Sequence, residues 1–352
     1  MYGLEGAKSI WNGFQMYPRG LAPYSDDVIV AHAMDWKMKD QKVPTIIGTL
    51  FDVWTLKNPG LKDWPHFFSW VPVDHQPAPP EVLAWCQLPN VKPVAMSKFG
   101  SRMLEVAGIE HFYAPHGIES AFKPTKNLKS GQLDVPAREF MEYTDDDFVV
   151  LMVAANKGVN PSRKAWAENL LAFSIFAQKH KDACLYLYTE PDGSMGGISL
   201  MRLLESVGIP KDRYKIIDQY AYRLGLPHEV MASLYTASDV LLSCSMGEGF
   251  GIPVIEAAAC GLPVIVSDFS AQPELVGEGW VVDGQPWWDA LQQAWFFTPR
   301  VMGIVDALEK AYDRPRGTSQ KQIQHAKQYQ ADTVYQEHWK PIMEKLHAWC
   351  QS

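Results

Sequence analysis

The second half of the chain alternates between apolar, strand-like segments and helical segments. Residues 148–154 form a continuous apolar run, as is typical of a strand buried on both faces of a parallel sheet. Further strand-like segments follow at 183–188, 214–217, 239–243 and 262–266. Helical segments are expected between them at 162–178, 200–207, 227–236 and 251–259. This alternation predicts an α/β fold with a doubly wound parallel sheet.

A length of 352 residues suggests about two domains. A stretch of low order near 123–127 places the boundary, which gives an N-terminal Rossmann-like domain over 1–125 and a C-terminal Rossmann-like domain over 126–330. Residues 331–352 are expected to form a C-terminal helix that packs back toward the N-terminal domain, because apolar residues recur there at helical spacing.

The N-terminal domain is predicted to be reduced. Most two-layer α/β domains open on a buried apolar strand and a Gly-rich turn. This chain opens instead on polar sequence that contains Gly3 and Gly6, with short strand-like pieces such as 14–17. A first βα unit is therefore expected to be missing, or to be replaced by the Gly3/Gly6 segment or by a partner.

Composition excludes several classes of protein. Hydrophobic residues make up 47% and charged residues 20%, which is a globular composition. The net charge of −8 gives no global basic footprint for nucleic acid, and no apolar run approaches the roughly 18 residues of a membrane span. The five cysteines lack CxxC spacing, which disfavours disulfides and thiolate metal sites and indicates the cytoplasm.

The most informative segment is the Gly-rich loop that joins a strand to a helix between 243 and 261. Free N–H groups at a helix start near Ile252 make an anion site, and Gly249 and Gly251 permit close approach of a ligand. Glu248 lies in the loop and Glu256 about one turn into the helix. Carboxylates beside an anion site suit a ligand that also carries hydroxyls, such as a nucleotide sugar. A generic turn with solvated acids is the alternative.

Glu248 and Glu256, with Gly-Phe-Gly-Ile-Pro between them, resemble the signature of retaining nucleotide-sugar glycosyltransferases with the GT-B fold, of the family 4 type (glycosyl transferases group 1). Residues 259–267 and 273–276 resemble that family's continuation. The resemblance implies two Rossmann-like domains facing a cleft, with Glu248 on the sugar and Glu256 on the ribose hydroxyls. The backbone implied to lie against the sugar and the diphosphate comprises Gly249, Phe250, Gly251 and Ile252.

The loop that follows the strand at 148–154 carries the expected cations. The family has an Arg and a Lys here that neutralise the donor diphosphate, and Lys164 matches the Lys. Arg163 or Lys157 supplies the other charge, and Asn156 is a further candidate for contact with the nucleotide-sugar donor. Because GT-B enzymes generally bind no metal, the resemblance implies neither a metal nor a cofactor, and cations stabilise the leaving diphosphate. A solvated basic helix start is the alternative.

Residues outside these loops resemble the family more loosely. His116 is a candidate donor contact, and a structural histidine is at least as good an interpretation. Asp52 follows a predicted strand, and Asp74 and His75 follow another. Because α/β sheets bind ligands at strand ends, Asp52 is a candidate for contact with the acceptor or the donor sugar, and Asp74 and His75 are further candidates. Tyr220 is placed near the donor base.

Two other features are interpreted as structural. The acidic run 145–147 is read as a solvated turn rather than a metal site. The aromatic residues at 287–288 and 295–297 are read as packing rather than as a platform on which a sugar stacks.

The sequence thus favours a retaining glycosyltransferase whose donor is a UDP-, GDP- or ADP-sugar. The acceptor is left open among a saccharide, a lipid, a protein and a modified nucleobase, and the acidic balance disfavours the last. A second hypothesis is a nucleotide-sugar-binding protein that is inactive alone or depends on a partner, because the first βα unit is missing. A GT-B epimerase or phosphorylase is a third, although no acid/base residue or cofactor lysine stands out for it.

Overall fold

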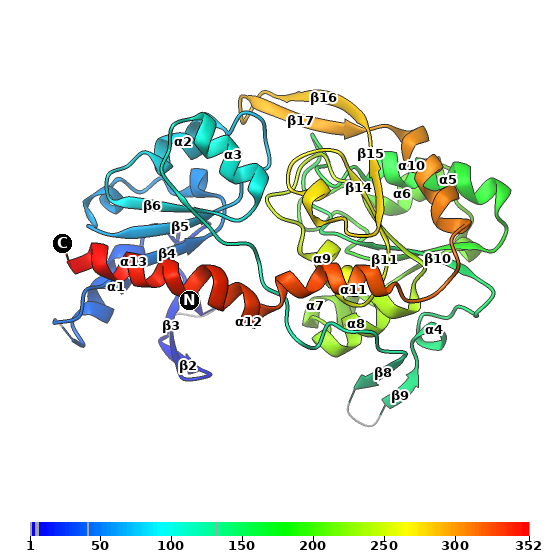
Figure 1. The fold of residues 1–352 in the computed structure, drawn as a ribbon, viewed down its shortest axis with the longest axis horizontal. Helices are drawn as coiled ribbons and strands as arrows, with labels where there is room; N and C mark the ends of the chain where they lie inside the picture. The colour runs from blue at the N-terminus through cyan, green and yellow to red at the C-terminus, as the bar shows by residue number, and fades with distance from the viewer. Residues whose placement is uncertain (1, 4–6, 41, 131–132, 352) are drawn as a thin grey trace. The chain divides into compact units, whose positions relative to one another are not determined.

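The computed structural model describes residues 2–3, 7–40, 42–130 and 133–351 (Figure 1). The chain divides into two compact units. Unit 1 comprises Met1–Val73, Ala78–Ala114 and His338–Ser352. Unit 2 comprises Asp74–Pro77 and Pro115–Glu337.

Unit 2 is built on a six-stranded sheet in which every strand pair is parallel. In spatial order the strands are β12 (Tyr214–Ile216), β11 (Ala183–Tyr188), β10 (Phe148–Val153), β13 (Val240–Ser243), β14 (Val264–Ser267) and β15 (Gly279–Val282). The direction of chain progression reverses between β10 and β13, as in a doubly wound sheet. At such a reversal the carboxyl ends of the strands open a crevice that binds ligands.

Helices alternate with these strands; the sequence predicts four of them, whereas the helices Gln219–Leu224, Val301–Tyr312 and Gln320–Ala326 were not predicted. In chain order the helices are α5 (Trp166–Lys179), α6 (Leu200–Ser206), α7 (Gln219–Leu224), α8 (His228–Ala237), α9 (Ile252–Ala259), α10 (Val301–Tyr312) and α11 (Gln320–Ala326). Helix α5 contacts α6 and α10, whereas α9 contacts α8 and α11 (Figure 1). All of β14 and all but the last residue of β10 are buried, so both faces of the sheet are covered.

The core of unit 2 forms where α5 packs on the central strands. Leu170 and Phe173 are fully buried in one cluster with Phe148, Val150 and Met152 of β10. Burial of such side chains contributes roughly 1.5–3 kcal/mol each to folding. This packing fixes the start of α5, and with it the loop that joins β10 to α5.

Unit 2 also contains two antiparallel hairpins and one short helix that the sequence does not predict, and a second short helix that begins the predicted last helical segment. They are β8 (Asn127–Ser130) with β9 (Leu133–Pro136), β16 (Gly284–Asp289) with β17 (Ala294–Pro299), α4 (Ala137–Phe140) and α12 (Ala331–Val334). In the second hairpin Phe296 is buried, which agrees with the interpretation of this aromatic run as packing. Trp288 and Trp295, however, are 47% and 43% exposed and meet edge to face.

Unit 1 has a four-stranded parallel sheet in which spatial order follows chain order. Its strands are β4 (Ile47–Leu50), β5 (Phe67–Val71), β6 (Val91–Ala95) and β7 (Phe112–Tyr113). Its helices are α1 (Ile29–Lys37), α2 (Pro80–Cys86), α3 (Lys98–Val106) and α13 (Lys340–Gln351). A small sheet at the start of the chain has the order β1 (Tyr2–Gly3), β3 (Phe14–Pro18), β2 (Ser9–Trp11). Gly6, one of the two glycines considered in place of a first βα unit, lies outside the described residues.

The last helical segment is not the single α-helix that the sequence predicts. A π-helical turn over Tyr335–Trp339 separates α12 from α13. In unit 1, Ile342 and Leu346 of α13 pack with Val94 and Ala114, and Trp339 contacts the ring of Trp70 edge to face at 4.8 Å. The spacing of apolar residues thus predicts the buried face of this segment correctly, but it does not reveal the π-helical turn.

Two neighbouring leucines of α5 test the core assignment. Leu170 is fully buried and Leu171 is 40% exposed. Leu170→Ala is expected to lower the free energy of unfolding by about 3 kcal/mol because it leaves a cavity, and Leu171→Ala by under about 0.5 kcal/mol. Urea denaturation of both variants measures this difference, and equal losses would contradict the packing described.

Candidate functional site

The loops that follow β10 and β13 lie side by side at the reversal of strand order. The two strands are neighbours, with Val150 opposite Val240. The loops are joined directly, since Met246 N–H donates to the carbonyl of Arg163 at 2.8 Å. Residues about 84 positions apart therefore meet at the carboxyl edge of the sheet.

Asn169, a fully buried residue of α5, forms hydrogen bonds with both loops. Its side-chain amide nitrogen lies 2.9 Å from the carbonyl oxygen of Ala165 and 2.7 Å from that of Cys244. It also donates to Lys164 O at 3.1 Å. The backbone that carries the expected cations is thus held to the backbone that leads to Glu248.

Glu248 forms ion pairs with both expected cations. The ammonium of Lys164 donates to Oε1 of Glu248, and Nη1 of Arg163 donates to Oε2 at 3.0 Å. Arg163 Nη1 also donates to the carbonyl of Gly247 at 2.6 Å. The side chains of Glu248 and Lys164 are 11% and 18% exposed, and that of Arg163 is 37% exposed. Arg163 and Lys157 were the two candidates for the second cation, and Arg163 is the one that pairs with Glu248.

The charges of this cluster shift each other's proton affinity. Burial raises the pKa of Glu248, but the charges of Lys164 and Arg163 outweigh it and bring that pKa down to about 2. Burial lowers the pKa of Lys164, an effect that the charge of Glu248 opposes and that of Arg163 reinforces. The carboxylate is therefore ionised at neutral pH, and each charge is stabilised by an opposite one instead of by water.

Two positions of the loop require glycine, Gly247 because of close contacts and Gly251 because of its backbone conformation. A Cβ on Gly247 would lie 2.5 Å from the carbonyl oxygen of Asp74 and 2.6 Å from the ring of Phe296. Gly251, the residue before α9, has φ of +116°, in the region that favours glycine. The helix that follows carries Ile252, 39% exposed, as its first residue.

Asp74 and His75 belong to unit 2 and lie beside this cluster. The charges of Arg163 and Glu248 both act on the Asp74 carboxyl. Nδ1 of His75 lies 2.7 Å from Oδ1 of Asp74, and Nε2 lies 3.4 Å from Oδ2 of Asp289. The strand-end pair singled out by the sequence thus adjoins the ion cluster.

Glu256 is half-buried on α9 and accepts a hydrogen bond from the hydroxyl of Tyr235 at 2.8 Å. Burial raises the pKa of Glu256, and this hydrogen bond opposes the rise. Phe250 is buried, with its ring 5.1 Å from that of His116. Burial lowers the pKa of His116 to about 4, so this ring is neutral at pH 7.

Three other residues were also expected in the site. Asn156 is buried, and its amide donates to the carbonyls of Glu190 and Ile198 and accepts from Ile198 N–H. These bonds commit it to holding the loop after β11. Lys157 is exposed in the same loop as Asn156, and Tyr220 is 74% exposed on α7.

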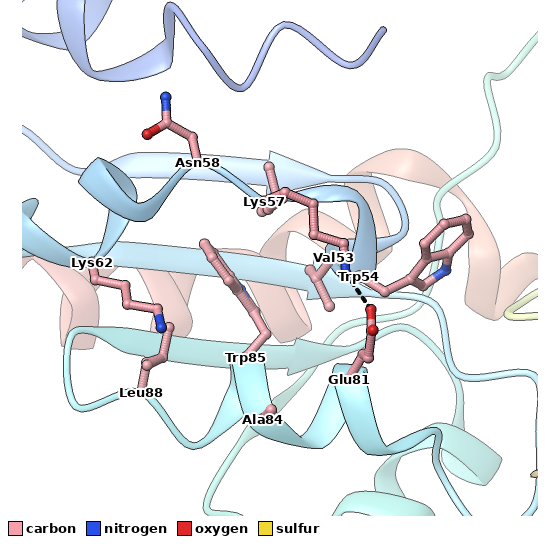
Figure 2. Close-up of a pocket in the computed structure, with 10 residues that line it drawn as sticks. Val53, Trp54, Lys57, Asn58, Lys62, Glu81, Ala84, Trp85 and Leu88 are labelled. Carbon is pink, nitrogen blue, oxygen red and sulfur yellow. Dashed lines mark hydrogen bonds and ion pairs between the residues drawn. The ribbon is translucent and has the colours of Figure 1, made fainter. Parts of the chain in front are cut away.

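Asp52 belongs to unit 1 and precedes a short 3-10 helix, Val53–Thr55, that follows β4. Its backbone carbonyl accepts from the N–H and the hydroxyl of Thr55. Val53 and Trp54 line a cavity of about 280 Å³ in this unit, at whose edge Lys57 and Glu81 form an ion pair (Figure 2).

Sequence reasoning missed three groups that organise this part of unit 2. Asn169, Tyr235 and Asp289 hold the cations, Glu256 and His75 respectively. None belongs to a recognisable local motif, because the partners that matter are Cys244 for Asn169, Glu256 for Tyr235 and His75 for Asp289, which lie 75, 21 and 214 residues away. The only signal was that Asn169 is polar within an apolar helix segment.

Among residues 2–3, 7–40, 42–130 and 133–351, no group of three His, Cys, Asp or Glu side chains is arranged to hold a metal ion. All five cysteines are free thiols. Within the same ranges, no helix has the length and apolar character needed to cross a membrane.

Lys164→Met should expose the electrostatic role of the cluster. The substitution keeps the aliphatic stem but leaves Glu248 with Arg163 as its remaining cationic partner. We expect the free energy of unfolding at neutral pH to fall by about 2 kcal/mol. The stability that an ionised Glu248 contributes in the wild type is lost only as pH falls toward about 2. In the variant the Glu248 pKa rises, so acid unfolding should begin at a higher pH.

Denaturant unfolding as a function of pH measures both effects. Lys215→Met is the matched control, because Lys215 pairs with Glu142 at the surface of the same unit, where the two side chains are 38% and 71% exposed. Its loss should cost under about 0.5 kcal/mol. Identical pH profiles for Lys164→Met and the wild type would contradict the ion cluster.

Comparison with known proteins agrees with this geometry. Residues 211–329, which include Glu248 and Glu256, match the model of the family described as Glycosyl transferases group 1. O-antigen chain mannosyltransferase B of Escherichia coli is 40% identical over 57 residues, 16% of this chain and 15% of that protein. D-inositol 3-phosphate glycosyltransferase of Corynebacterium urealyticum is 35% identical over 98 residues, 23% of each chain. These matches span well under two thirds of either relative.

The fold resembles solved structures over almost its whole length. Sucrose-phosphate synthase from Thermosynechococcus elongatus superposes with a TM-score of 0.70 at 16% identity, covering 97% of this chain and 85% of that one. At this identity the likeness shows the fold alone. The GT-B fold expected from the sequence is therefore confirmed, and residues 211–329 within it match the glycosyl transferases group 1 model.

Proposed function

We propose that this chain is a family 4 type glycosyltransferase that moves a sugar from a nucleotide-sugar donor to an acceptor hydroxyl, with retention of configuration and without a metal. The observation that carries the proposal is the pairing of Glu248 with Lys164 and Arg163 at the reversal of strand order. A doubly wound sheet binds its ligand at this point.

The two cations supply what a departing diphosphate needs. A phosphate that enters between the loops competes with Glu248 for the ammonium of Lys164 and the guanidinium of Arg163. Arginine binds phosphate oxygens in a fixed fork, and lysine adds a point charge. The N-terminus of α9 adds its positive dipole end beside Gly251.

Release of Glu248 from its cations then gives the site a second function. The freed carboxylate accepts hydrogen bonds from sugar hydroxyls, so binding of the diphosphate and orientation of the sugar are coupled. Glu256 takes the ribose hydroxyls, with one of its oxygens already held by Tyr235. Close backbone approach at Gly249 and Gly251 admits the sugar and the diphosphate.

The reaction exchanges one bond at the anomeric carbon. The bond to the diphosphate oxygen breaks while the acceptor oxygen bonds to the face that the leaving group vacates. The acceptor proton passes to the departing diphosphate. We assign no covalent intermediate and place the reaction in the cytoplasm, which the five free cysteines favour.

Donor turnover tests the proposal. The full chain is incubated in EDTA with UDP-, GDP- and ADP-sugars, and release of nucleoside diphosphate is measured with and without a panel of acceptors. We expect Lys164→Ala and Glu248→Ala each to slow release by about 100-fold, as loss of one preorganised charge does in other enzymes. Lys215→Ala should leave the rate unchanged. An NMR spectrum of the product reports the anomeric configuration.

Two outcomes would redirect the assignment. Unchanged rates in both site variants would contradict it. Calorimetric binding of a donor with no turnover on any acceptor would favour the second hypothesis, a nucleotide-sugar-binding protein that is inactive alone or depends on a partner.

A further inference from the structure

A short segment, Asp74–Pro77, is fastened to the hairpin β16–β17 of unit 2. Gln76 and Trp295 exchange two backbone hydrogen bonds, at 3.1 and 3.0 Å. The imidazole of His75 stacks on the ring of Phe296, with ring centres 3.6 Å apart and planes 22° apart. The chain before and after this segment belongs to unit 1. The segment is thus held in place by partners more than 200 residues away.

His75 is buried between two carboxylates. Its exposed fraction is 4%, with Asp74 at Nδ1 and Asp289 at Nε2. A neutral imidazole donates from one nitrogen only, whereas a doubly protonated ring donates to both carboxylates. Phe296 fixes the plane of the ring, so its direction toward Asp74 is set by packing as well as by charge.

The charges of the ion cluster influence the proton affinity of Asp74. Burial raises the pKa of Asp74, but the hydrogen bond and charge of His75 and the charge of Arg163 lower it below its ordinary value, against the opposing charge of Glu248. Its backbone carbonyl lies close against Gly247, the residue before Glu248. Its side chain keeps 24% exposure, so the carboxylate is not sealed from solvent.

We infer that Asp74 is a second sugar-binding carboxylate of this site and that His75, held by Asp289 and Phe296, is its positioning residue. This inference rests on the proposed function. An ionised carboxylate is an acceptor only, which suits sugar hydroxyls, and His75 uses one of its oxygens. The hairpin β16–β17 then serves to hold Asp74 beside Glu248.

The charges that face Asp74 and His75 come from three other parts of unit 2. Asp289 lies on the hairpin, Glu248 on the loop after β13, and Arg163 with Lys164 on the loop after β10. Removal of the imidazole deprives Asp74 of its nearest hydrogen-bond donor. The Asp74 pKa should then rise, and Asp74 should become protonated at a higher pH than in the wild type.

His75→Gln tests this by way of a pH profile. We expect the ratio of donor turnover at about pH 5 to that at about pH 8 to fall by about tenfold in the variant. In an Asp74→Asn background, His75→Gln should leave that ratio unchanged, because no titrating carboxyl remains to be positioned. Asp74→Asn alone should raise the KM for the donor sugar more than it changes the affinity for the nucleoside diphosphate.

His180→Gln is the matched control. His180 also pairs with a carboxylate, Glu309 at 2.8 Å, and packs on the ring of Phe176, but it lies at the end of α5 opposite the loops. It should lower the melting temperature without altering the pH ratio. If His75→Gln does not fold, Asp289→Asn leaves the ring in place and should lower the ratio in the same direction.

The outcomes separate this inference from the function on which it rests. A wild type that turns over its donor, with an unchanged pH ratio in His75→Gln and Asp289→Asn, would overturn the inference alone. An altered ratio that persists in the Asp74→Asn background would also overturn it. A wild type that neither binds nor hydrolyses any nucleotide sugar would overturn both.

Discussion

The pairing of β10 with β13 is the constraint on which the site depends. The two strands are consecutive neighbours in the sheet but are separated in the chain by β11, β12 and the helices between them. Their carboxyl ends therefore emerge together, and the loops that follow have no strand between them. Asn169 and the Met246–Arg163 hydrogen bond then hold these loops in contact. Cations from one loop and a carboxylate from the other meet because the topology places the two loops next to each other.

In the ion cluster, Glu248 neutralises the two cations that the proposed function assigns to donor binding. Two cations at the carboxyl edge of a buried sheet would repel each other if no anion lay between them. Glu248 supplies that anion, and its low pKa keeps it charged at any physiological pH. Under the proposed function, a donor phosphate brings the same charge to the same two cations, so the donor and Glu248 compete for them. A site arranged in this way keeps its cations paired without a ligand, and a ligand that binds there replaces the ion pairs of Glu248 with its own.

Much of unit 2 follows from local sequence. Continuous apolar strands, amphipathic helices and a Gly-rich turn each have a local signature, and the structure confirms their order. Lys164, Arg163 and Glu248 were singled out because the loops that carry them resemble those of a known glycosyltransferase family. The hairpin β16–β17 was missed because its aromatic residues also suit packing. The partnership of His75 with Asp289 has no local signature, since it is created by tertiary contact across 214 residues. Sequence alone also gives no sign of the π turn before α13.

The competition between Glu248 and a diphosphate for the same two cations is the central claim, and calorimetry tests it directly. Binding of the nucleoside diphosphates UDP, GDP and ADP is compared between the wild type and Glu248→Gln, which keeps the size of the side chain and removes its charge. We predict that the variant binds the preferred diphosphate more tightly, because Lys164 and Arg163 no longer have a competing anion. Equal or weaker binding by the variant would contradict the account.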